Sequence, residues 1–209
     1  MKPLSLTLKN FGPYINETID FTKFEDSSLF LISGKTGSGK TTIFDGMSYA
    51  LFGESSGKLR LGKEMRSTFA DPSEATEVTL LFKHNEYLYE LNRLPEQELF
   101  KKRGTGVRKQ SAKISLIVKD AQGKELRSYS KRREVDELIQ ELLHLNANQF
   151  AQIVLLPQGE FRTFLIAKSD EKEKVLRNLF GTELYQLFSE NLKERLKIAN
   201  QEIQETQQK

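Results

Sequence analysis

Apolar and polar side chains alternate near the N-terminus, a pattern typical of strands with one buried face. Leu4, Leu6 and Leu8 are separated by polar residues and predict the first strand. The sequence at residues 10–13 contains asparagine, glycine and proline, which favour a turn. A second short strand is expected at residues 18–21. The chain therefore begins with two strands joined by a tight turn.

The same alternation recurs in the middle of the chain and predicts a β-rich insertion over residues 76–130. Its clearest members are residues 78–82, 87–91 and 114–118, where every second side chain is apolar or aromatic. Such runs are typical of strands in an antiparallel sheet. The basic, glycine-containing segment Lys101–Gln110 lies between two of them and is expected to be a loop.

Two segments show the spacing of amphipathic helices. From Lys40 onward, Ile43 and Met47 lie on one helical face, and Gly53 follows where a helix C-terminal glycine is expected. Residues 133–145 repeat apolar side chains at intervals of three and four and predict a second helix.

Two short runs are apolar without interruption. Leu29–Ile32 is bounded by serine and glycine, and Ile153–Leu156 is stopped by Pro157. Continuous runs of this length are typical of strands buried on both faces of a sheet. We therefore expect both runs to be central strands.

The last part of the chain, residues 169–209, is expected to be helical. Ser169 can cap a helix that ends near Gly181, and no glycine or proline follows Thr182. Four apolar residues then step by four, three and four positions, which is coiled-coil spacing: Leu192, Leu196, Ala199 and Ile203. An ordinary amphipathic helix is the alternative for so short a stripe. Because no stop signal occurs before Lys209, we interpret this helix as the truncated start of a coiled coil.

Composition removes several classes of protein. The 209 residues include no cysteine, which excludes disulfide scaffolds and zinc sites with cysteine ligands. No apolar run is long enough to span a membrane and no secretion signal is present, so we expect a cytoplasmic protein. The net charge is only +3, but residues 101–133 hold 12 basic and two acidic side chains. This local excess favours an anionic partner.

One motif carries specific chemistry, the phosphate-binding loop G-x-x-x-x-G-K-[ST]. It lies between the run Leu29–Ile32 and the helix that starts at Lys40, as the motif requires. In such a loop, backbone N–H groups surround the phosphates of ATP, Lys40 reaches the β- and γ-phosphates, and the Thr41 hydroxyl binds Mg²⁺. The predicted nucleotide-binding residues are Gly34, Lys35, Thr36, Gly37, Ser38, Gly39, Lys40, Thr41 and Thr42.

The remaining parts of a nucleotide hydrolase are missing from the sequence. No guanine-recognition motif and no Gly-Gly pair for an ABC signature loop occur. The nearest candidate for a magnesium-binding acidic strand is residues 116–120, but Lys119 interrupts it, and we interpret Asp120 as a turn residue. His84 and His144 are expected to be structural. The incomplete set argues against a self-contained small-molecule kinase.

Four segments together resemble the N-terminal ATPase half of the SbcC family, the ATPase subunits of bacterial double-strand-break nucleases. They are MKPLSLTLKNFGPY, FLISGKTGSGKTTIFDGMSYALFG, FAQIVLLPQGEFRTFL and SDEKEKVLRNLFGTELY. The resemblance implies an α/β P-loop NTPase of the ABC type, split by a long coiled coil, so that this chain is half of a head. Residues 1–168 would be the N-terminal lobe and residues 169–209 the helical segment that leads into the coiled coil.

The resemblance also implies residue roles and partners. Gln158 occupies the Q-loop position, where it would complete the magnesium shell and sense the γ-phosphate, whereas Gly12-Pro13 replaces a basic nucleotide contact of some relatives. The implied partners are the chain's own C-terminal ATPase half, an SbcD-type nuclease subunit, a second head engaged through ATP, and double-stranded DNA of the nucleoid. The alternative is a chromosome-structural or recombination-mediator ATPase without a nuclease partner.

The basic excess supplies candidate DNA contacts. Phosphate contacts give affinity without sequence preference, and the basic segment has few aromatic residues for stacking on bases. A solvated basic face or a surface for an acidic partner is the alternative. The residues expected to contact duplex DNA are Lys101, Lys102, Arg103, Arg108 and Lys109.

Overall fold

The computed structural model describes most of the chain in five stretches. These are residues 1–24, 29–55, 62–101, 103–151 and 183–207. The chain divides into two compact units, Met1–Arg162 and Thr163–Lys209. The expected boundary between residues 168 and 169 lies outside the described residues and stays a prediction.

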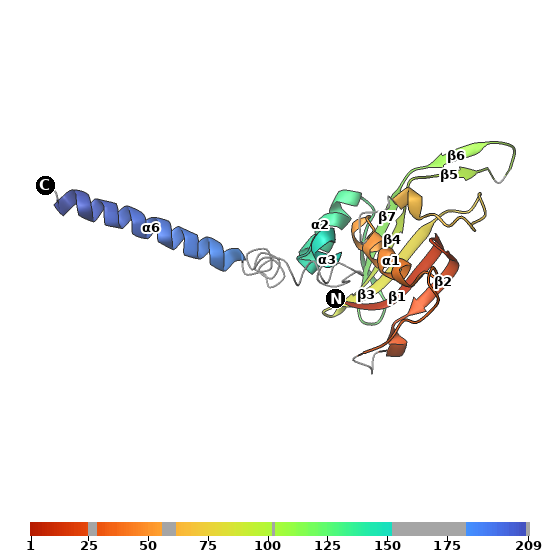
Figure 1. The fold of residues 1–209 in the computed structure, drawn as a ribbon, viewed down its shortest axis with the longest axis horizontal. Coiled ribbons are helices and arrows are strands. Elements are labelled where there is room, and N and C mark those ends of the chain that lie inside the picture. The colour runs from red at the N-terminus through yellow and green to blue at the C-terminus, as the bar shows by residue number, and fades with distance from the viewer. Residues whose placement is uncertain (25–28, 56–61, 102, 152–182, 208–209) are drawn as a thin grey trace. The chain divides into compact units, whose positions relative to one another are not determined.

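The first unit is built around an antiparallel sheet of six strands (Figure 1). The strand order is β2-β1-β3-β4-β7-β8, so β1 lies between β2 and β3. A separate two-stranded sheet is formed by β5 and β6. The strands are β1 (Lys2–Phe11), β2 (Tyr14–Asp20), β3 (Glu77–His84), β4 (Tyr87–Leu94), β5 (Gln97–Phe100), β6 (Val107–Gln110), β7 (Lys113–Lys119) and β8 (Glu125–Tyr129).

Helix α1 (Lys40–Phe52) packs against β1, β3 and β4. It approaches the sheet closely at Gly46, where an added Cβ would lie 2.6 Å from Leu8 Cδ2. The apolar positions that predicted the strands and the helix meet in this layer and are removed from water, which is the main stabilising contribution to such a fold. The core includes Leu6, Leu8, Leu80, Phe82, Leu91 and Leu116 from the sheet and Met47, Ala50 and Leu51 from α1.

Two further helices, α2 (Arg132–Leu143) and α3 (Ala147–Phe150), contact α1, and α2 also contacts β7. Two short 3₁₀ turns, η1 (Thr22–Phe24) and η2 (Gly62–Met65), precede α1 and β3 respectively. Val135 and Ile139 are the buried residues of α2. The helices predicted from Lys40 and over residues 133–145 are therefore confirmed with small shifts at their ends.

Arg93 on β4 joins the end of α1 to α2. Its Nε donates to the Ala50 carbonyl at 3.0 Å, and its Nη2 donates to the Leu51 carbonyl at 3.2 Å and to Asp136 Oδ1 at 2.9 Å. The last carbonyls of a helix lack intrahelical donors and carry the negative end of its dipole. The buried guanidinium of Arg93 donates to these carbonyls and places a positive charge at the negative end of the dipole. It thereby fixes the C-terminal end of α1, the helix that follows the phosphate loop.

Two sequence predictions for the first unit are wrong. Leu29–Ile32 forms no strand, and Leu29 and Leu31 are 86% and 88% exposed. An apolar run becomes a strand only where another strand offers it a hydrogen-bonding edge, and no described strand pairs with this run. Part of the expected loop Lys101–Gln110 is also a strand, because β6 pairs with β5 in a hairpin. The expected strand Ile153–Leu156 lies outside the described residues.

The described part of the second unit is one long helix, α6 (Glu183–Gln207). It confirms the helix predicted after Thr182, and its apolar residues Phe188, Leu192, Leu196 and Ile203 are all exposed. The expected capped helix from Ser169 to Gly181 lies outside the described residues. No helix among the described residues is both long enough and apolar enough to cross a membrane.

Candidate nucleotide site

The phosphate loop forms a tight cradle at the N-terminus of α1. The Lys40 Nζ donates to the backbone carbonyls of Gly34 and Lys35, each at 2.8 Å, so the ammonium group bridges the start of the loop. The Ser38 N–H donates to the Lys35 carbonyl at 3.1 Å and closes the turn. Both acceptors of Lys40 are neutral. Phosphate oxygens carry negative charge and make stronger charge-assisted bonds, so they can replace these acceptors.

Glycine is required at two positions of this loop. Gly37 and Gly39 have φ of 84° and 91°, a left-handed conformation that side chains with a Cβ rarely adopt. Gly39 is also the N-cap of α1 and has no side chain that could occupy the N–H groups of the first turn. Those N–H groups and the positive end of the helix dipole therefore stay available to an anion.

The turn between β1 and β2, where Gly12-Pro13 was expected to replace a basic nucleotide contact, forms a wall of the site. An added Cβ on Gly12 would lie 2.5 Å from Thr42 Cγ2, and one on Gly39 would lie 2.5 Å from Pro13 Cγ. The Tyr14 hydroxyl donates to the Gly39 carbonyl at 3.1 Å. Partial burial, and secondly the charge of Glu17, raise the pKa of Tyr14, which keeps this donor protonated. The turn thus holds the phosphate loop in place.

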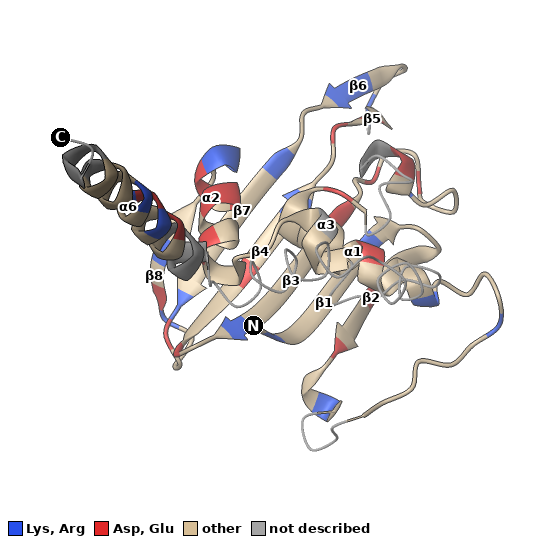
Figure 2. Ribbon diagram, turned by 60° about the vertical axis from the view of Figure 1, so that its left-hand side comes forward, with Lys and Arg blue, Asp and Glu red and all other residues tan. Residues whose placement is uncertain are grey.

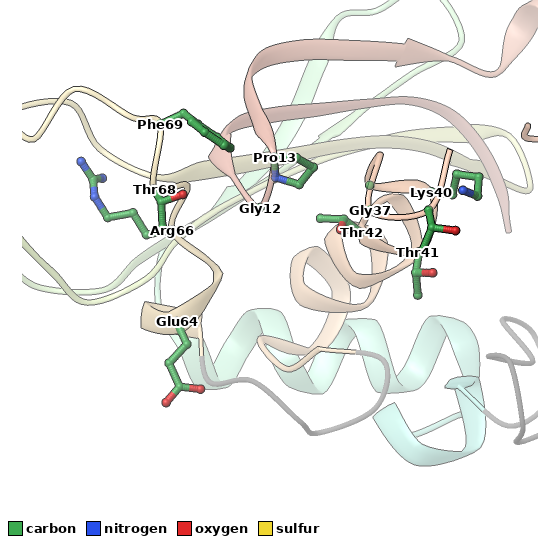
Figure 3. A pocket seen from close by; sticks show the side chains of 12 residues that line it. Gly12, Pro13, Gly37, Lys40, Thr41, Thr42, Glu64, Arg66, Thr68 and Phe69 are labelled. Carbon is green, nitrogen blue, oxygen red and sulfur yellow. The ribbon is translucent and has the colours of Figure 1, made fainter. Parts of the chain in front are cut away.

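A cavity of about 590 Å³ extends from the phosphate loop along this turn (Figure 3). Its volume lies within the range of ~300–1,000 Å³ that is usual for small-molecule sites. One wall consists of loop and helix residues, from Thr36 to Thr42. The opposite wall consists of residues in η2 and directly after it. The second wall contributes Glu64, Arg66, Thr68 and Phe69, which no sequence motif had marked.

Arg66 has a structural role in that wall. Its Nη1 donates to the Glu74 carbonyl at 2.7 Å and to Gln97 Oε1 at 3.2 Å, and its Nη2 donates to the Asp71 carbonyl at 2.8 Å. Burial lowers the pKa of Arg66, and the charge of Asp71 opposes this shift. The guanidinium points away from Lys40 (Figure 3), so it supports the chain around the cavity.

The residues present fit an Mg²⁺ ion that is held mainly by phosphate and water. Thr41 lines the cavity beside Lys40, whereas Glu64 lies on the opposite wall. Among the described residues, no group of three or more His, Cys, Asp or Glu side chains is placed to hold a metal ion by itself. Mg²⁺ commonly keeps several waters and uses few protein ligands in phosphate sites. Gln158, the other expected ligand, lies outside the described residues.

Asp120 has the turn role expected for it. Its Oδ1 accepts from the N–H groups of Gln122 and Lys124 at 3.0 and 2.9 Å. The strand β7 ends one residue earlier, at Lys119, whose ammonium pairs with Glu90. Asp120 also does not line the cavity at the phosphate loop. The acidic strand end of a hydrolase is therefore not supplied by this segment.

The expected DNA contacts lie on and near the β5–β6 hairpin (Figure 2). Lys101, Arg103 and Arg108 are exposed and take part in no ion pair within the described part of the chain. Lys109 pairs with Glu96 at 3.0 Å. Lys102 lies outside the described residues.

A second basic cluster, Lys131–Arg133 at the N-terminal end of α2, is neutralised locally. Lys131 pairs with Glu134 at 2.9 Å, Arg132 with Asp136 at 3.3 Å and Arg133 with Glu137 at 2.7 Å. Because each cation has a carboxylate three or four residues further on, this cluster offers little net charge to a polyanion. The excess charge of residues 101–133 therefore lies mainly at the hairpin.

A mixed α/β fold with a complete phosphate loop at the start of a packed helix defines a P-loop nucleotide-binding domain. The family model described as AAA domain matches residues 5–209. The chain belongs to this family, which confirms the expected α/β class of P-loop protein.

Curated relatives extend the comparison. The SbcC subunit of the nuclease SbcCD from Lactococcus lactis subsp. lactis (strain IL1403) is 45% identical over 196 residues, covering 92% of this chain and 18% of the relative. The protein of the same name from Staphylococcus aureus (strain MRSA252) is 46% identical over 204 residues, covering 98% and 20%. The chain thus spans about a fifth of the length of these relatives.

A solved structure from work on ATP-driven dimerization and DNA-stimulated activation of SMC ATPases is also similar. Its TM-score is 0.44 at 16% identity, with 85% of this chain and 99% of the other covered.

Proposed function

We propose that this chain is the N-terminal, ATP-binding half of the ATPase head in an SbcCD-type DNA nuclease. One observation carries the proposal: a complete phosphate loop lies in a chain that matches SbcC subunits of SbcCD nucleases over 92–98% of its length. In the complete protein, ATP binding and hydrolysis would engage two heads, clamp duplex DNA and control the nuclease partner during processing of double-strand breaks and hairpins.

The site needs a second half to become a hydrolase. Lys40 can neutralise β- and γ-phosphate charge, and the Thr41 hydroxyl can hold the metal. When bound, Mg²⁺ would offset the negative charge of the phosphate oxygens. In the part of the chain that the structure describes, no carboxylate beside Lys40 is placed at a strand end to orient a water. We propose that the C-terminal half supplies this group.

The exposed apolar run supports the same idea. Leu29 and Leu31 are almost fully exposed, and Phe30 stacks on Phe24 with ring centroids 5.0 Å apart. A run of this kind directly before a phosphate loop is stabilised when strands on both sides remove it from water. We propose that strands of the C-terminal half pair with it and place their acidic ends beside Thr41.

ATP turnover by the 209-residue chain, alone and mixed with the C-terminal half, tests this proposal. We expect weak Mg-ATP binding and negligible hydrolysis by the chain alone, and restored hydrolysis in the mixture. Lys40→Ala should abolish the restored activity because it removes charge from the β- and γ-phosphates. Turnover by the chain alone at the rate of the mixture would disprove the split site.

DNA binding is proposed for the hairpin, since its cations at Lys101, Arg103 and Arg108 are exposed. Each phosphate contact that is lost reduces the slope of log affinity against log salt by about 0.9. Replacing all three cations by serine should therefore flatten the slope for duplex DNA by about two to three units.

A matched control changes Lys131, Arg132 and Arg133 to serine. This variant removes the same formal charge from residues that are already ion-paired, so its slope should stay close to that of the wild type. Equal slopes for both triple variants would assign the hairpin charge to another role. Copurification of an SbcD-type phosphoesterase with the full-length protein tests the proposed nuclease partner.

A further inference from the structure

Phe69 is a large aromatic residue that the protein leaves in water at the edge of the nucleotide cavity. Its side chain is 76% exposed, although it lines the same cavity as Lys40 and Thr41. Exposure of a phenyl ring forgoes the stabilisation that burial of its apolar surface would give. An exposed ring inside a ligand cavity is accounted for when a ligand covers it.

The two ends of the cavity differ in chemistry. The phosphate end consists of backbone N–H groups, the Lys40 ammonium and the side chains of three threonines, all suited to anions. The other end carries Phe69 beside Thr68 and the Gly12-Pro13 turn (Figure 3). Arg66 does not offer a bidentate guanidinium to a ligand there, because both of its Nη atoms bond to the supporting chain. The far end therefore offers the flat apolar face of Phe69 beside the polar side chains of Thr68 and Glu64.

We infer that Phe69 is the stacking platform for the base of the bound nucleoside triphosphate. This inference rests on the proposed function and adds the residue that positions the base. Nucleobases stack on aromatic side chains, because every base has a π-face and a flat apolar area. With the triphosphate held at Lys40, the base lies against Phe69 across the turn, and stacking orients the nucleotide along the cavity.

A comparison of ATP with inorganic tripolyphosphate tests the inference, because tripolyphosphate carries the phosphates without a base. In titrations of the 209-residue chain with Mg²⁺ present, Phe69→Ala should weaken ATP binding about tenfold, which corresponds to about 1.4 kcal/mol. Its affinity for tripolyphosphate should stay that of the wild type. Phe69→Tyr keeps the ring and should keep ATP affinity. Phe100→Ala, which removes another exposed phenyl ring (56% exposed), should change neither.

A fluorescence measurement gives an independent readout. The chain contains no tryptophan, so Phe69→Trp introduces a single indole, and ATP should change its emission whereas tripolyphosphate should not. Equal affinities of wild type and Phe69→Ala for ATP would overturn the inference. So would equal losses for ATP and tripolyphosphate, because they would assign Phe69 to the shape of the phosphate loop.

Lys40→Ala separates this inference from the proposed function. The nucleotide site and the role of Phe69 are both supported if Lys40→Ala loses affinity for ATP and for tripolyphosphate, whereas Phe69→Ala loses affinity for ATP alone. If the wild type binds neither ligand, the proposed nucleotide site fails, and the role of Phe69 fails with it.

Discussion

Replacing Arg93 by methionine is expected to lower the free energy of unfolding by about 3 kcal/mol, since it breaks a partly buried ion pair and two bonds from a buried guanidinium to carbonyls. Arg93 is 5% exposed and donates to Ala50, Leu51 and Asp136. Breaking a buried pair typically costs about 3–5 kcal/mol. The lower end applies here because Asp136 is 38% exposed and can regain water. The methionine keeps most of the apolar volume, so the loss is mainly polar.

Urea unfolding followed by circular dichroism measures this change. Arg132→Met is the matched control, because Arg132 pairs with the same Asp136 but is 75% exposed. Exposed pairs contribute about 0–1 kcal/mol, so this control should stay near the wild type. A double-mutant cycle with Asp136→Asn separates the ion pair from the two carbonyl bonds. An Arg93→Met variant within about 0.5 kcal/mol of the wild type would refute the argument that Arg93 fixes the end of α1.

Three other expectations concern the loop, the core and the predicted Q-loop residue. Gly12→Ala should destabilise more than Gly104→Ala in urea unfolding, because both glycines have positive φ but only Gly12 faces an atom, Thr42 Cγ2. Burial raises the pKa of Tyr49 to about 12. The folded state therefore binds the Tyr49 proton more tightly than the unfolded chain does. This difference contributes stability that is complete below pH 10 and is lost as the pH rises from 10 through 12. Tyr49→Phe should remove this alkaline loss from denaturant midpoints. Gln158→Ala should leave ATP affinity nearly unchanged and weaken ATP-driven head engagement, measured by sedimentation of the reassembled head; unaltered engagement would return Gln158 to an ordinary surface residue.

Local patterns predicted the elements whose structure depends on residues that are near one another in the sequence. The alternation of Leu6 and Leu8, and of Val78, Leu80 and Phe82, marked strands that bury these side chains. The phosphate loop was predicted because its chemistry depends on a short contiguous motif. For the same reason Gly53 marked the end of α1, where it adopts the left-handed conformation and donates to the Tyr49 carbonyl at 2.8 Å.

The errors and omissions involve contacts between distant segments. Leu29–Ile32 has the composition of a central strand, yet pairing depends on a partner that the run itself does not specify. Pro13 and Phe69 line the candidate nucleotide cavity only because the β1–β2 turn and the segment that follows η2 meet beside α1. The ion pairs of Lys131 to Glu134 and Arg133 to Glu137 could have been predicted from their spacing, since helical residues three and four apart are neighbours.

The position of β1 between β2 and β3 has a consequence for the order of folding. Leu6 pairs with Ile19 of β2 on one side and with Leu80 of β3 on the other. The phosphate loop therefore lies in the long chain segment that connects β2 to β3, the two strands that flank β1. Closing such a long connection costs conformational entropy that grows with its length, and the pairing of strands that are distant in the sequence is slow. Helix α1 docks on β1 through Gly46, against Leu8. After dilution from denaturant, helical signal should therefore return first, and the ability to bind phosphate should return only with the slower closure of β1 onto β3.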